Sequence, residues 1–169
     1  MAKFYNSLVF GFGVLILMLG FSVLYFRFAV SDISAAGGLI DLEFPKGAKI
    51  VDQYDSHGGF QDEGEYWAVI DLTSKQTGEV LLQLKANNNW HKLPMPKEMQ
   101  MFFSANDVEN GKSLTIPEHG YYFFRDRYVE LHPEFKKTSL SDPKRRSYNY
   151  IIGIYDNDFN KIYIWKCDS

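Results

Sequence analysis

Residues 150–167 read YIIGIYDNDFNKIYIWKC, and this stretch has a strong β-strand character. Ile, Tyr and Trp favour strands because branched and aromatic side chains pack well on a pleated surface. The apolar runs 148–155 and 161–167 are separated by the residues DNDFN, which favour a turn. We therefore predict two antiparallel strands joined by a five-residue hairpin loop over 156–160.

Three other stretches are predicted to be strands. Residues 120–128 are rich in Tyr and Phe, and residues 49–54 and 65–72 alternate in part between polar and apolar side chains. Alternation of this kind is the pattern of a half-buried strand. We expect the segments 49–54 and 65–72 to pair antiparallel through the connection 55–64.

Two helices are expected in the middle of the chain. Thr73 and Gln76 have the spacing of a capping box, and apolar side chains follow at helical spacing as far as Asn87. Pro96 suits the first turn of a second, short helix. Strands outnumber helices and the helices are grouped, which predicts an α+β fold. We expect a mainly antiparallel sheet with one or two helices packed on one face.

The N-terminal part of the chain is apolar. No charged residue lies between Lys3 and Arg27, and a helix of this length crosses the ~30 Å hydrocarbon layer of a membrane. A signal peptide cleaved near residues 34–36, SAA, is the alternative, although the apolar core of such a peptide is usually shorter. We predict a short tail over 1–7, a transmembrane helix over 8–27, a linker over 28–43 and a soluble α+β domain over 44–169.

The charges that flank this apolar run do not orient it, because Lys3 and Arg27 nearly balance each other. A short tail followed at once by a long apolar run is typical of an uncleaved signal anchor. We therefore expect a single-pass protein of the cell membrane, held in the lipid bilayer by residues 8–27, whose soluble domain is extracytoplasmic.

Charge and cysteine content narrow the class of protein. Residues 28–169 carry all 21 acidic side chains but only 16 of the 18 basic ones, a formal charge of −5, which argues against a nucleic-acid partner. Basic residues gather at 136–137 and 144–146, which we interpret as a solvated loop. The only cysteine is Cys167, so no intrachain disulfide can form. These features fit a bacterial envelope protein.

The densest group of polar residues lies over 55–65. Three glycines and several carboxylates surround His57 in this stretch. In a functional interpretation His57 acts as a general base or metal ligand and is oriented by Asp55 or Asp62, because a carboxylate fixes the tautomer of an imidazole. In the alternative, the glycines form a wide hairpin, the acids are solvated and His57 only hydrogen-bonds the backbone.

Two further groups could contribute to a site. His119 precedes the 120–128 strand and would approach His57 if the strands are neighbours. Arg125 and Arg127 are two residues apart, so on a strand they share a face and could hold a carboxylate or phosphate. Pairing with the protein's own acids is the alternative. Because the ligand spacings of known metal sites are absent, we expect no metal and no cofactor. Residues 156–160 start like a calcium loop, but Lys161 replaces its glycine.

Several segments together resemble one family. The N-terminal anchor, SHGGFQDEGE at 56–65, LPMP at 93–96, HGYYFFRDR at 119–127 and YIIGIYDNDFNKIYIWK at 150–166 look like a family of small single-span membrane-anchored bacterial proteins of unknown function. The resemblance implies no activity. We therefore favour a membrane-tethered domain without catalytic activity that binds an envelope protein, a glycan or another ligand. The alternative is a small membrane-anchored hydrolase or metal-dependent enzyme that uses His57 with nearby carboxylates.

Overall fold

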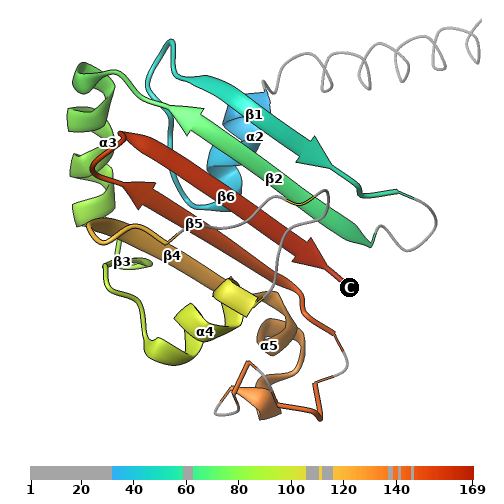
Figure 1. Cartoon of the computed structure of the whole chain (residues 1–169). Coiled ribbons are helices and arrows are strands. Elements are labelled where there is room, and N and C mark those ends of the chain that lie inside the picture. The colour runs from blue at the N-terminus through green and yellow to red at the C-terminus, as the bar shows by residue number, and fades with distance from the viewer. Residues whose placement is uncertain are drawn as a thin grey trace, which may run out of the picture.

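The computed structural model describes residues 32–58, 63–105, 111, 116–136, 139–140, 142–145 and 147–169. The predicted tail and transmembrane helix, residues 1–7 and 8–27, lie outside the described residues. Within the described part, no helix is long and apolar enough to cross a membrane. The fold is α+β, as predicted, and consists of a six-stranded antiparallel sheet with a few helices (Figure 1).

The sheet has the strand order β1-β2-β6-β5-β4-β3, and all neighbouring strands are antiparallel. The strands are β1 (Lys49–Asp55), β2 (Gly64–Asp71), β3 (Trp90–Lys92), β4 (Gly120–Asp126), β5 (Tyr150–Asp156) and β6 (Lys161–Asp168). The predicted pairing of the first two strands is confirmed. The C-terminal hairpin lies at the centre of the sheet (Figure 1), which explains why its sequence is so rich in apolar side chains.

The hairpin turn between β5 and β6 is one residue shorter than predicted. Asp156 still pairs with Lys161, so only residues 157–160 form the loop. The Asp156 carboxylate accepts hydrogen bonds from the backbone N–H groups of Asp158 (2.8 Å) and Phe159 (3.1 Å). Aspartate commonly closes turns in this way, and this role accounts for the oxygen-rich sequence without a calcium ion.

Helix α3 (Ser74–Ala86) starts with the predicted capping box. The Gln76 backbone donates to Thr73 Oγ1 (3.4 Å), and the Thr73 backbone donates to Gln76 Oε1 (2.8 Å). The helix ends at the C-cap Asn87, as expected. Helix α4 (Lys97–Ala105) confirms the second predicted helix after Pro96.

The helices cover both faces of the sheet, so the prediction that they pack on one face is wrong. Buried side chains of α3 pack with one set of strand residues, including Ile162 and Ile164. Phe103 of α4 packs on the other face, where its ring contacts Trp165 and Tyr150. The physical reason is that β5 is buried along its whole length. A strand that is apolar on both sides needs cover on both.

Part of the segment expected to be a linker over 28–43 is a helix that belongs to the core. Helix α2 (Asp32–Leu39) covers the same face as α3, and Ala36 is buried there. Ile40 follows the helix, is fully buried, and accepts a hydrogen bond from Trp90 Nε1 (2.9 Å) on its carbonyl. The buried positions of α2 are the small residues Ala36 and Gly37.

The strand predicted over 120–128 ends earlier, because a helix begins at its end. Asp126 caps helix α5 (Arg127–Leu131) by accepting a hydrogen bond from the Val129 backbone (3.1 Å). Asp126 also binds Arg145 through both oxygens, at 2.7 and 2.9 Å, and the Arg145 side chain is fully buried. The interpretation of the basic residues 144–146 as a solvated loop is therefore wrong for Arg145. A one-turn 3₁₀ helix, η2 (Pro133–Phe135), follows α5.

Candidate functional site

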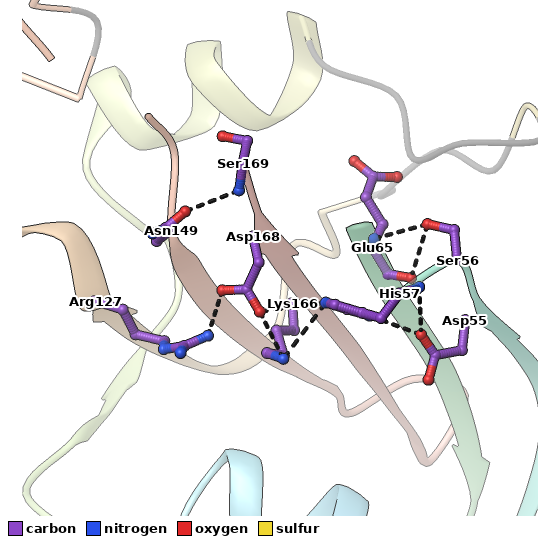
Figure 2. Close-up of polar contacts among 9 residues, drawn as sticks. All are labelled: Asp55, Ser56, His57, Glu65, Arg127, Asn149, Lys166, Asp168 and Ser169. Atoms are coloured by element: carbon purple, nitrogen blue, oxygen red, sulfur yellow. Dashed lines mark hydrogen bonds and ion pairs between the residues drawn. The ribbon is translucent and has the colours of Figure 1, made fainter. Parts of the chain in front are cut away.

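His57 lies just beyond the end of β1 and is held by Asp55. Its Nδ1 is 2.7 Å from Asp55 Oδ1, and its backbone N–H donates to the same oxygen at 3.0 Å (Figure 2). The side chain is 10% exposed. Because a carboxylate only accepts hydrogen bonds, Nδ1 carries a proton. The predicted pairing of His57 with Asp55 is therefore present in the structure.

The other ring nitrogen faces the C-terminal end of β6. His57 Nε2 lies 3.2 Å from Asp168 Oδ2 and 3.4 Å from Lys166 Nζ. Lys166 Nζ is in turn 2.6 Å from Asp168 Oδ2, and Arg127 of α5 donates to Asp168 Oδ1. Figure 2 shows these side chains in a row from Asp55 to Arg127. We call Asp55, His57, Lys166, Asp168 and Arg127 the histidine cluster.

The histidine cluster leaves no ring nitrogen of His57 open to a substrate. With neutral imidazole, Nε2 accepts a hydrogen bond from Lys166, and with protonated imidazole it donates to Asp168. Both arrangements use partners within the protein. A general base needs a ring nitrogen within hydrogen-bond reach of the proton that it abstracts. In this geometry His57 joins β1, β6 and α5 and does not present a free base.

Hydrogen bonds between Ser56 and Glu65 fix the histidine cluster at the end of the β1–β2 pair where the chain passes from β1 to β2. The Ser56 backbone donates to the Glu65 carbonyl (2.9 Å), and the Glu65 backbone donates to Ser56 Oγ (2.8 Å). Gly64 has a φ of +152°, and a Cβ there would come within 2.7 Å of the His57 backbone. Glycine is thus required at 64, because any side chain would displace His57.

The C-terminus closes the other side of the histidine cluster. The Ser169 backbone donates to Asn149 Oδ1 (2.8 Å), and the Tyr148 backbone donates to Ser169 Oγ (2.8 Å). These bonds hold the residue after Asp168 against the chain that enters β5 (Figure 2). Asp168 is therefore restrained by the hydrogen bonds of the residue that follows it, Ser169.

A cavity of about 380 Å³ lies beside the histidine cluster, between α2 and the sheet. Its apolar wall comes from the small and aliphatic side chains of α2. Its polar lining consists of Asp32, Gln53, Asp55, His57, Tyr66 and Lys166. Burial, together with the charges of Asp32 and Asp55, raises the pKa of Tyr66 from 10.0 to about 12, so its hydroxyl stays protonated at neutral pH. This volume is in the range of small-molecule sites. We call it the α2 cavity.

The other predicted site residues do not join His57. His119 pairs with Asp158 (3.6 Å), near the hairpin turn at the far end of the sheet. Arg125 binds Glu130 (2.7 Å) and so holds the pKa of that carboxyl below its usual range. Asp62 lies outside the described residues. Within the described ranges, no group of three or more His, Cys, Asp or Glu side chains is placed to hold a metal ion.

The expectation that Arg125 and Arg127 share a sheet face is wrong. Arg125 is in β4, whereas Arg127 is the first residue of α5. The capping side chain of Asp126 ends the strand between them, so one arginine turns to Glu130 and the other to Asp168. The pair therefore cannot grip one anion from a common face.

Lys166 and Asp168 are the site residues that sequence reasoning missed. Both lie more than 100 positions from His57 and approach it only because β6 pairs with β2, with Gly64 opposite Asp168. The available signal was their spacing of two, which places both side chains on one face of a strand. To place these two side chains beside His57, one would also have had to know that β6 pairs with β2.

Comparisons with known proteins do not place the chain in a family. No family model, no curated protein and no solved structure matches it.

Proposed function

We propose that this protein is a single-pass membrane protein whose extracytoplasmic domain binds a ligand or partner and has no catalytic activity. The α2 cavity beside a closed ion-pair cluster carries the proposal. A cavity with convergent polar groups on a rigid frame is typical of a binding site. The frame here is held by the ion pairs of Asp168 with Lys166 and Arg127 and by the hydrogen bond between Asp55 and His57.

Two features of the sequence support the membrane tether. The run from 8 to 27 is long enough to cross a bilayer and holds one charge, at its end. The described domain starts at Asp32, a few residues later. A domain joined so closely to an anchor would stay near the membrane surface and would serve to bind something located there.

The alternative function, a small hydrolase or metal-dependent enzyme, is favoured by one observation. Asp55 on Nδ1 orients His57 as an acid orients the histidine of a catalytic pair. Against it, Asp168 and Lys166 already contact Nε2, where a nucleophile or substrate would have to bind. The closed geometry therefore supports the binding function more strongly.

Labelling of cells tests the tether and its orientation. Phe159 is 70% exposed, so Phe159→Cys in a Cys167→Ser background offers one accessible thiol. We expect a membrane-impermeant maleimide to label it in intact cells, and the protein to remain in the membrane after an alkaline wash. The Cys167→Ser single variant is the control and should stay unlabelled. Labelling only after permeabilisation would overturn the orientation, and release by the wash would overturn the tether.

A further inference from the structure

The α2 cavity presents acceptors for a positively charged group. Asp32 comes from the start of α2 and Asp55 from the end of β1, and both line the cavity. Both contacts between Asp55 and His57 use Oδ1, which leaves Oδ2 for a ligand. Two carboxylates from separate elements therefore face the same space.

Tyr66 adds an unused polar group to these carboxylates. It is 9% exposed, lines the α2 cavity, and has no hydrogen bond to another residue in the described part of the chain. A tyrosine hydroxyl that lines a cavity can donate one hydrogen bond to a ligand and accept others from it. Burial first, and then the negative charges of Asp32 and Asp55, raise the pKa of Tyr66.

Lys166 supplies a donor to the same space. Its ammonium carries three N–H groups, of which Asp168 and His57 accept two. Lys166 also lines the α2 cavity and is 20% exposed. A ligand with a positive and a negative group would therefore find a partner for each.

The distance to the membrane is short. Five residue steps separate Arg27, at the end of the apolar run, from Asp32. Even a fully extended chain covers at most about 18 Å in five steps. A cavity lined by Asp32 would thus lie within reach of lipid headgroups if residues 8–27 span the bilayer.

We propose that the α2 cavity binds a small zwitterion with a primary ammonium group, which Asp32, Asp55 and the Tyr66 hydroxyl receive, while Lys166 receives the anionic group. This proposal rests on the proposed binding function and names its ligand class. A primary ammonium donates three hydrogen bonds, whereas a quaternary one donates none. The cavity should therefore discriminate between an ethanolamine and a choline headgroup.

Calorimetry on the full chain in phosphatidylcholine nanodiscs tests the ligand class. We expect O-phosphoethanolamine to bind and phosphocholine to bind at least about tenfold more weakly, because each lost charge-assisted hydrogen bond costs roughly that factor. Asp32→Asn and Tyr66→Phe should each weaken binding of O-phosphoethanolamine about tenfold. Tyr163→Phe, on the opposite face of the sheet, is the matched control and should leave the affinity unchanged. Equal affinity for the two compounds, or no binding of either, would overturn the proposal.

A second nanodisc distinguishes a lipid headgroup from a soluble ligand. If the zwitterion is a lipid headgroup, phosphatidylethanolamine in the disc should compete with O-phosphoethanolamine and slow hydrogen exchange over α2. If it is soluble, phosphatidylethanolamine should change neither. Both results support the ligand class. The ligand proposal would be refuted if neither compound binds in calorimetry and phosphatidylethanolamine has no effect. If the thiol at position 159 is still labelled in intact cells, the proposal of a membrane-tethered extracytoplasmic domain would be unaffected.

Discussion

Asp168→Asn should destabilise the protein more than any surface charge change, because Lys166, Arg127 and His57 all contact this carboxylate. Lys166 Nζ lies 2.6 Å away, His57 Nε2 lies 3.2 Å away, and Arg127 donates to the other oxygen. Asparagine has nearly the same shape but lacks the negative charge. The substitution therefore leaves Lys166 and Arg127 without their counter-charge, and little else changes.

The size of the loss in unfolding free energy depends on how deeply the charges are buried. Removing one member of a fully buried ion pair costs about 3–5 kcal/mol, whereas an exposed pair contributes about 0–1 kcal/mol. The side chains of Asp168, Lys166 and His57 are only 10–20% exposed, but that of Arg127 is 37% exposed. Water can thus solvate part of the cluster, and we expect Asp168→Asn to lower the free energy of unfolding by about 2–3 kcal/mol.

Urea unfolding of the full chain in a non-ionic detergent, followed by tryptophan fluorescence, measures this loss. The midpoint should fall while the slope with urea stays constant. Asp71→Asn is the matched control, because Asp71 makes a half-exposed pair with Lys161 at 3.3 Å; its cost should stay below about 1 kcal/mol. If Asp168→Asn costs no more than this control, the histidine cluster is not a structural lock.

Three further predictions concern stability elsewhere in the domain. Arg145→Met should cost about 3–5 kcal/mol because it leaves a carboxylate without its buried partner, while Lys144→Met, which changes an exposed neighbour, should cost less than about 0.5 kcal/mol. Gly153→Ala should cost about 1–3 kcal/mol, because its Cβ would meet core side chains at 2.9 and 3.0 Å, whereas Gly78→Ala meets nothing and should stabilise its helix by about 0.5–1 kcal/mol. The pKa of Tyr66 is raised to about 12 in the folded protein, so its contribution to stability is complete below pH 10 and is lost as pH rises towards 12. Between pH 9 and pH 11 the free energy of unfolding of the wild type should therefore fall by roughly 1 kcal/mol more than that of Tyr66→Phe.

The same denaturation assay checks all three. Equal midpoints for Arg145→Met and Lys144→Met would show that the buried pair is not needed. If Gly153→Ala and Gly78→Ala change the free energy of unfolding equally, the core side chains around position 153 can move to make room for a methyl group. Parallel pH profiles for wild type and Tyr66→Phe would contradict the environment described for the α2 cavity.

Sequence reasoning succeeded where the determining contacts are local. The Thr73–Gln76 capping box, the strand pair at the start of the sheet and the C-terminal hairpin depend on residues a few positions apart. The pairing of His57 with Asp55 is equally local, since the two residues are two positions apart. Propensity and spacing suffice for such features because the chain itself keeps the partners together.

Features set by strand order could not be predicted. Lys166 and Asp168 reach His57 through the β2–β6 register, and no local pattern specifies that β6 lies between β2 and β5. Arg127 turns away from Arg125 because Asp126 caps a helix that begins at Arg127. The tendency of these residues to continue the strand is weaker than this capping interaction. The helices on both faces follow from β5, whose uninterrupted apolar run should have indicated burial on both sides.

Reactivity of the histidines towards diethyl pyrocarbonate tests the central claim that His57 is locked in the frame of a binding site and is not a free base. The reagent modifies accessible, unprotonated imidazole nitrogens, and mass spectrometry assigns each modified residue. His119, whose side chain is 69% exposed, serves as the internal reference. We expect His57 to react at least about tenfold more slowly than His119 in the wild type and to react faster in Asp168→Asn than in the wild type. A rate for wild-type His57 equal to that of His119 would contradict the closed cluster and favour the enzyme.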